Sequence, residues 1–234
     1  YPVLETVAKE IAIWDVLVTK AHIAREYRYC KPQLVPSSED PIPSFVEARG
    51  LRHALIEQLQ TSEIYVTNDV FMGGAETPSG ILLYGTNAVG KTSLIRALGI
   101  AVILAQAGCY VPCTHFRFHP YRAIYSRILG NDNLFKGLST FAVEMSELRM
   151  ILKMADEHSL ILGDELCSGT EIESALSIFL SGIMDLHHKQ SSFIFATHFH
   201  EILHFEELKA LSRLAIKHMS VVYDREGDCL IYDR

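Results

Sequence analysis

The sequence is poor in the residues that cross-link a fold. Its five cysteines, at positions 30, 109, 113, 167 and 229, are an odd number and include no Cys-x-x-Cys pair. The pair Cys109 and Cys113 has no second pair that would complete a zinc site. We therefore expect reduced thiols and an intracellular location. A chain of 234 residues can bury a core large enough to fold without disulfides or metal.

A basic excess and a long apolar run are also missing. Lys and Arg number 21 against 28 Asp and Glu, a formal net charge of −7, which excludes a free-standing polybasic binder of DNA or membranes. No apolar run approaches the ~20 residues of a membrane-spanning helix, and no signal peptide opens the chain. The chain starts at Tyr1 and stops at Arg234 without a tail, so we expect a piece of a larger protein.

The first 43 residues are expected to form a helical segment followed by a linker. Apolar residues recur at three- and four-residue steps, which predicts a helix over 4–30 with one apolar face. Lys31-Pro32 ends this pattern, since the residue before a proline disfavours helix. The Pro- and Ser-rich stretch 36–43 is typical of a linker. We place a domain boundary there, between 1–43 and 44–234.

The remainder of the chain alternates short apolar segments with helical patterns. The expected strands are 44–48, 64–67, 81–84, 160–162 and 193–196, the expected helices are 90–107 and 174–187, and 71–80 is expected to be a loop. Strands that alternate with helices predict an α/β fold, with a layered, mostly parallel sheet flanked by helices.

The strongest motif follows the expected strand 81–84. Residues 85–92, GTNAVGKT, fit the G-x-x-x-x-G-K-[ST] pattern of a phosphate-binding P-loop. Glycines let successive backbone N–H groups face a phosphate, and the following helix contributes its N-terminal dipole. In this pattern Lys91 reaches the β- and γ-phosphates and Thr92 binds Mg²⁺. The expected nucleotide contacts are Gly85, Thr86, Asn87, Ala88, Val89, Gly90, Lys91, Thr92 and Ser93.

Two further strand ends carry polar groups suited to ATP hydrolysis. The strand 160–162 leads to Asp164 and Glu165, at the end where open α/β sheets bind ligands. We expect Asp164 to bind Mg²⁺ and Glu165 to orient the attacking water. The strand 193–196 leads to Thr197 and His198, and His198 is expected to sense the γ-phosphate. No cysteine or carboxylate pattern joins the neighbouring histidines into a metal site.

These segments together resemble the MutS family of DNA mismatch-repair ATPases, which belongs to the ABC ATPase superfamily. The resemblance covers about residues 45–232. The matching blocks are RH at 52–53 with IE at 56–57, YVTND at 65–69, GTNAVGKT at 85–92, AQAGCYVPC at 105–113, LSTFAVEM at 138–145, DELCSGT at 164–170 and ATHFHE at 196–201. Cys167-Ser168 replaces the family's usual Gly-Arg. Such departures resemble the divergent branch of giant viruses and corals, or the branch of plant organelles.

The resemblance implies roles that the motifs alone do not. Tyr65 corresponds to the aromatic residue that stacks on adenine, and Asn87 to a residue near the γ-phosphate. Ser139 corresponds to the signature serine, which in ABC-type ATPases completes the ATP site of the opposite subunit. This implies a homodimer, or a heterodimer with a paralogue, with composite ATP sites. The alternative is that Ser139 only caps the helix that follows it.

The resemblance also implies partners and leaves the biological role open. The first 30 residues resemble the end of the family's lever helix, which couples the ATPase to a clamp on mismatched duplex DNA. The clamp and a C-terminal helical tail lie outside this chain. Two alternatives stay open: a MutS-related protein that acts in recombination or crossover, and an ABC ATPase of the SMC class. The SMC class carries a signature close to Leu-Ser-Gly-Gly, whereas this chain has LSTF at 138–141.

Overall fold

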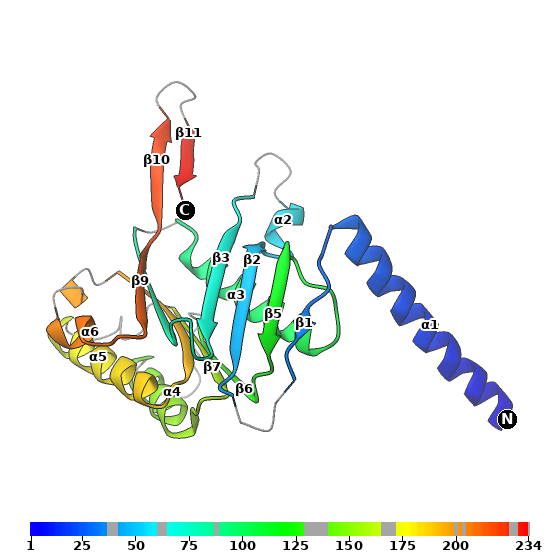
Figure 1. Cartoon of the computed structure of the whole chain (residues 1–234), viewed down its shortest axis with the longest axis horizontal. Helices are drawn as coiled ribbons and strands as arrows, with labels where there is room; N and C mark the ends of the chain where they lie inside the picture. The colour runs from blue at the N-terminus through cyan, green and yellow to red at the C-terminus, as the bar shows by residue number, and fades with distance from the viewer. Residues whose placement is uncertain are drawn as a thin grey trace.

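The computed structural model describes residues 1–36, 42–59, 65–86, 89–128, 140–164, 172–198, 201–202, 205–224 and 229–233. The chain opens with the helix α1 (Pro2–Glu26), which projects away from the body of the molecule (Figure 1). This helix ends four residues before the predicted end at residue 30, because Arg28 takes a left-handed backbone conformation with φ 53°. Only Ala24 of α1 is buried, so the predicted apolar face has no cover within the described chain.

The central sheet is entirely parallel. Its order is β6 (Ala123–Arg127), β7 (Ser159–Asp164), β8 (Ser192–Thr197), β4 (Gly80–Tyr84) and β9 (Leu214–His218). The three strands β7, β8 and β4 correspond to the predicted strands 160–162, 193–196 and 81–84. Every residue of β7 and β8 is buried, as expected for parallel strands that are covered on both faces.

A smaller, mixed sheet lies in front of the central one in Figure 1. Its order is β1 (Gln33–Leu34), β5 (His115–His119), β2 (Phe45–Leu51) and β3 (Asn68–Gly73). The predicted strand 64–67 is wrong over 65–67, and the predicted loop 71–80 is wrong over its first three residues and at Gly80, which begins β4. The strand begins at Asn68 and continues to Gly73 because it pairs antiparallel with β2, with Val46 opposite Met72.

Helices cover both faces of the central sheet. The helix α3 (Lys91–Gln106) matches the predicted helix 90–107 and lies between the two sheets, against β7, β8 and β2. The opposite face is covered by α4 (Thr140–Met154) and α5 (Ile172–His188), the latter predicted as 174–187. The prediction of an α/β fold with a layered, mostly parallel sheet is therefore confirmed.

The remaining elements are short. They are α2 (Ile56–Leu59), α6 (Glu206–Lys209) and a hairpin of β10 (Ser220–Asp224) and β11 (Cys229–Asp233), which extends from β9 (Figure 1). No helix in the described part of the chain combines the length and the apolar character that crossing a membrane requires.

Candidate nucleotide-binding edge

The parallel register brings the predicted site residues to one edge of the central sheet. Asp164 ends β7 opposite Ala196 of β8, and Thr197 of β8 is opposite Tyr84 of β4. The glycine loop 85–90 therefore begins beside the ends of β7 and β8, and His198 follows directly after β8. This is the carboxyl edge, where open α/β sheets bind ligands.

The loop after β4 begins and ends at a glycine with a positive φ. Gly85 has φ 151°, and a Cβ at that position would lie 2.6 Å from the carbonyl oxygen of Met219. Gly90 takes a left-handed conformation, with φ 96°, directly before the first residue of α3. Both positions require glycine, so the two glycines of the sequence pattern have a local steric reason. The turn aims the N-terminus of α3 at the loop.

Lys91 folds back over this loop. Its side chain is buried, and its Nζ donates to the carbonyl oxygens of Gly85 at 2.7 Å and Thr86 at 2.8 Å. A buried ammonium needs acceptors, and these carbonyls supply two of them. The same position places a positive charge at the mouth of the loop.

Thr92 and Asp164 form the second half of the site. The Thr92 hydroxyl donates to Asp164 Oδ2 at 2.5 Å, and thereby joins the first turn of α3 to the end of β7. Asp164 is 5% exposed, and its Oδ1 has no hydrogen-bond partner among the described residues. A hydroxyl beside a buried carboxylate oxygen that lacks a partner is the oxygen donor set that Mg²⁺ prefers. The residues present therefore fit this ion.

Four of the predicted site residues lie outside the described residues: Asn87, Ala88, Ser139 and Glu165. Tyr65 and His198 are described and half-buried. Tyr65 precedes Thr67, which lines a cavity of about 330 Å³ between β3 and β4. No cluster of three metal-binding side chains occurs among the described residues.

The strand β9 also contributes to this edge, which the sequence did not indicate. His218, at the end of β9, packs its ring 4.6 Å from that of Tyr84, between ring centroids. Lys217 and His218 also line the 330 Å³ cavity, together with Asn68 and Asp69. An apolar run, Leu214 to Ile216, was the available signal for β9. It is too short to distinguish a strand from a helix segment without its partner β4.

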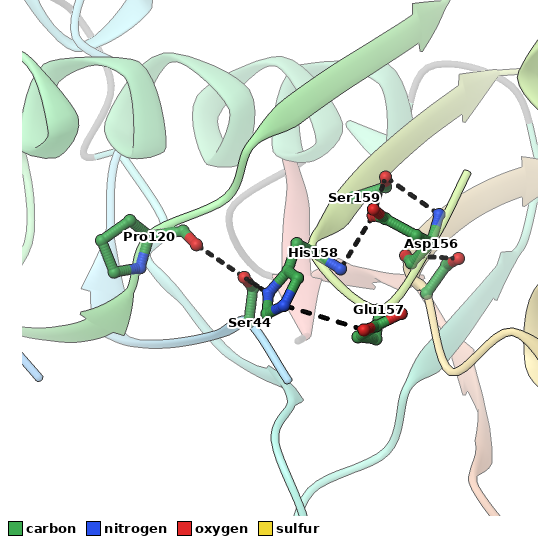
Figure 2. A network of polar contacts seen from close by, with 7 residues as sticks. Ser44, Pro120, Asp156, Glu157, His158 and Ser159 are labelled. Carbon is green, nitrogen blue, oxygen red and sulfur yellow. Dashed lines mark hydrogen bonds and ion pairs between the residues drawn. The ribbon is translucent and has the colours of Figure 1, made fainter. Parts of the chain in front are cut away.

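A second polar cluster lies at the opposite, amino edge of the sheet. Ser44, His158 and Glu157 form a serine–histidine–acid series, with the Ser44 hydroxyl 3.0 Å from His158 Nδ1 (Figure 2). The Ser44 hydroxyl donates its proton to the Pro120 carbonyl at 2.6 Å, so its contact with His158 requires a proton on Nδ1. That tautomer cannot accept the serine proton, and Ser44 is fully buried. The cluster is therefore not a hydrolase triad.

Asp156 fixes the turn that leads into β7. Its carboxylate accepts from the His158 amide at 3.0 Å and from Ser159 Oγ at 2.7 Å (Figure 2). Burial by itself raises the pKa of Asp156, but these hydrogen bonds outweigh it and leave the pKa below its ordinary value. The start of β7, five residues before Asp164, is thus held by an ionised side chain.

The fold and its carboxyl edge define a candidate phosphate-binding α/β domain. In the comparison with known proteins, the family model of MutS domain V matches residues 81–233. A mutS homologue of Acanthamoeba polyphaga mimivirus is 39% identical over 99% of this chain and 23% of its own length. The mitochondrial DNA mismatch repair protein mutS homologue of Sarcophyton glaucum is 39% identical, over 94% of this chain and 22% of its own.

A bacterial relative extends the match over the whole chain. The DNA mismatch repair protein MutS of Cytophaga hutchinsonii is 34% identical over 100% of this chain and 26% of its own length. The chain belongs to the MutS family, as the motifs predicted, and its relatives include a viral and an organellar protein. It spans about a quarter of the length of these relatives.

Proposed function

We propose that this chain is the ATP-binding and ATP-hydrolysing domain of a MutS-like DNA mismatch-repair protein, built as an ABC-type P-loop NTPase. The observation that carries the proposal is the contact of Thr92 with Asp164, whose buried Oδ1 has no hydrogen-bond partner in the part of the chain that the structure describes. A carboxylate in that state is costly unless a cation or a bound water completes it. The adjacent glycine loop and Lys91 supply the groups that bind phosphate.

Each group has a distinct chemical task. Backbone N–H groups of residues 85–93 bind the phosphates, and Lys91 neutralises the β- and γ-phosphates. Thr92 and Asp164 hold Mg²⁺, which supplies positive charge to the phosphate oxygens when it is bound. Glu165, next to Asp164 in sequence, orients the attacking water. Asn87 and His198 contact the γ-phosphate or that water.

The family resemblance assigns two further residues to this proposal. Tyr65 stacks on the adenine, because an aromatic ring offers a flat apolar face to the base. Ser139 reaches the γ-phosphate of a second subunit, so that ATP binding and dimerisation are thermodynamically linked. The second subunit is another copy of this chain or a paralogue.

The proposed output is a change in a DNA clamp. In this reading α1 is the lever that couples nucleotide state to parts of the protein that bind mismatched duplex DNA inside the cell. The names of the relatives favour mismatch repair. A role in recombination or crossover uses the same ATPase site and remains the alternative. The match to MutS domain V disfavours the SMC class.

Nucleotide binding is tested first. Lys91→Ala removes the charge at the loop, and we expect loss of tight binding of a fluorescent ATP analogue. Lys209→Ala, on the exposed helix α6, is the matched control and keeps the wild-type affinity. Equal affinity of the Lys91→Ala variant and wild type would contradict the phosphate-loop assignment.

Hydrolysis and biological role need separate measurements. Glu165→Gln is expected to retain ATP but to lower the hydrolysis rate by about 10²–10⁴-fold and to favour an ATP-bound dimer. Full activity in that variant would remove Glu165 as the water-orienting residue. ATP turnover by the full-length protein is then compared with matched, mismatched and branched duplexes. A response to mismatches supports repair, whereas a response to branched DNA alone supports recombination.

A further inference from the structure

A chain of hydrogen bonds crosses the molecule at the edge opposite the candidate site, with the buried Tyr121 at its centre and the exposed Gln106 at one end. The Tyr121 hydroxyl donates to Ser192 Oγ at 3.0 Å. Its backbone N–H donates to Gln106 Oε1 at 2.8 Å, and its carbonyl accepts from Gln106 Nε2 at 3.0 Å. Gln106 is the last residue of α3, and Ser192 is the first residue of β8.

The same chain continues to the start of β7. Ser192 Oγ donates onward to the Ser44 carbonyl at 3.4 Å. The Ser44 hydroxyl in turn joins Pro120, the residue before Tyr121, to His158, the residue before β7 (Figure 2). Tyr121, Ser192 and Ser44 are all buried. Burial also raises the pKa of Tyr121, so its hydroxyl stays protonated and remains a donor.

The three elements joined at this edge carry the candidate site at their other ends. The helix α3 begins with Lys91 and Thr92, β7 ends with Asp164, and β8 ends just before His198. We propose that Tyr121 is a positioning residue for ATP hydrolysis. Its hydrogen bonds join the C-terminal end of α3 to the start of β8, and the contacts of Ser44 extend this connection to the start of β7. The connection thereby sets the distance between Thr92 and Asp164. This inference rests on the proposed ATPase function.

The physical reason is the geometry of the elements. Strand register is fixed by the backbone ladder, but α3 is held against the sheet by side chains, chiefly by non-directional apolar packing. A directional hydrogen bond at its far end restricts sliding and rotation of the whole helix. The residues proposed to bind phosphate lie within one segment, from β4 through the loop to Lys91, so their arrangement does not depend on the hydrogen bonds of Tyr121. The pair that holds Mg²⁺ spans two elements, Thr92 on α3 and Asp164 on β7, and does depend on them.

The test is Tyr121→Phe in the full-length protein. Phenylalanine keeps the ring volume but leaves the Ser192 hydroxyl without its donor. We expect the Mg²⁺ concentration for half-maximal hydrolysis to rise by at least about 3-fold and kcat to fall by about 3–10-fold, with the KM for ATP within about 2-fold of wild type. Mn²⁺ binding to the ADP complex, followed by electron paramagnetic resonance, should weaken by at least about 3-fold.

Tyr125→Phe is the matched control. Tyr125 lies on the neighbouring strand β6, and its hydroxyl makes no hydrogen bond within the described part of the chain, so neither cation measurement should change. Ser192→Ala should reproduce the Tyr121→Phe effect, and the double variant should be no worse than the more affected single variant. If Tyr121→Phe does not fold, Gln106→Met removes the other bonds of the same connection and is expected to give the same weakening.

The proposal is overturned if Tyr121→Phe lowers the thermal midpoint while both cation measurements match those of Tyr125→Phe. It is also overturned if the Tyr121→Phe and Ser192→Ala effects on Mn²⁺ affinity are additive, because the hydrogen bond between the two residues would then make no contribution to that affinity. Failure of the underlying function has a different signature. In that case wild type itself, like Lys91→Ala, would neither bind nor hydrolyse ATP.

Discussion

The helices α1 and α3 are both apolar in sequence, yet α3 is largely buried and α1 is largely exposed. Nine of the sixteen residues of α3 are buried, because it lies between two sheets. Of the 25 residues of α1 only Ala24 is buried, and Trp14 and Leu17 are 65% and 52% exposed. An apolar helix sequence therefore does not indicate whether the helix is buried within the same segment of chain.

The two helices also differ in how they are anchored. The body of α3 is held along its length by the core, whereas α1 is held mainly near its C-terminal end. Arg52 donates to the carbonyl oxygens of Tyr27 and Arg28, and Cys30 forms an antiparallel bridge with Val111. A helix fixed at one end and exposed along its length suits the proposed lever.

Substitution of one leucine in each helix gives the largest expected difference. Leu98 of α3 is 0% exposed, and Leu98→Ala should lower the free energy of unfolding by about 2–5 kcal/mol, because it removes buried methyl groups and leaves a cavity. Leu17→Ala in α1 should change it by less than about 0.5 kcal/mol, since that side chain is largely in water. Urea unfolding of this chain measures both values.

The contrast would be broken if Leu17→Ala were as costly as Leu98→Ala, because α1 would then be packed in solution on a surface absent from the structure. Repeating the pair in the full-length protein sharpens the comparison. If the proposed lever packs on other domains, the cost of Leu17→Ala rises there and the cost of Leu98→Ala stays the same.

Much of this difference in burial between α1 and α3 could not be predicted from the sequence. The glycine loop, Lys91, Thr92 and Asp164 could be proposed from the sequence because each belongs to a pattern in which backbone geometry and chemistry restrict the residue type. The helix 90–107 was predictable because a loop with fixed geometry precedes it. The exposure of α1 was not predictable, since periodicity records an apolar stripe and not its cover.

The smaller sheet shows a second limit. Residues 71–73 were expected in a loop because two glycines follow Phe71 within three positions, yet they pair with β2. The strands β5 and β6 gave no usable signal, because their pairing partners are distant in sequence. The hydrogen bonds of Tyr121 could not be predicted for the same reason, because Gln106, Tyr121 and Ser192 meet only after the sheet has formed.

Arg52→Met tests the anchor of α1 and should have the second-largest effect. The variant removes the donors that hold the left-handed exit at Arg28, and it breaks the 2.5 Å ion pair with Glu57. We expect a loss of about 1.5–3 kcal/mol in the free energy of unfolding. Amide hydrogen exchange across residues 20–30 should also accelerate, while exchange in α3 stays slow.

Two further variants make this result interpretable. Arg25→Met, on the exposed last turn of α1, should leave hydrogen exchange unchanged. Glu57→Gln added to Arg52→Met should recover part of the stability, because the unpaired carboxylate is removed. Unaltered exchange over 20–30 in Arg52→Met would show that another contact holds the helix.

A smaller effect is expected from pH at the same junction. His53 Nδ1 accepts from the amides of Leu55 at 3.2 Å and Ile56 at 3.3 Å. Burial, and then the charge of Arg96, lower the pKa of His53 below 6.5, its value in the unfolded chain. The unfolded state therefore takes up the proton first as the pH falls below about 6.5, and stability declines from there toward the lower folded pKa. Above that window the contribution is complete.

Urea unfolding at pH 7.5 and 5.5 measures this decline. His187 has a pKa lowered by burial and by neighbouring charges and contributes a decline of the same sign. His53→Gln isolates the contribution of His53: the free energy of unfolding of this variant should decline less between the two pH values than that of wild type. An equal decline in the variant would assign the pH dependence to His187 and other groups.

The smallest effect is expected where the two helices touch. Lys20 of α1 donates to the carbonyl oxygen of Ala107, the C-cap of α3, at 3.5 Å. A cation at a helix C-terminus is favourable, but a long contact open to solvent is weak and screened by salt, so Lys20→Met should cost less than about 0.5 kcal/mol. Lys9→Met, on the exposed part of α1, is the control. A cost above about 1 kcal/mol for Lys20→Met, reduced by added salt, would mean that α1 rests on the end of α3. The proposed lever would then receive nucleotide state directly through the helix that begins at Lys91.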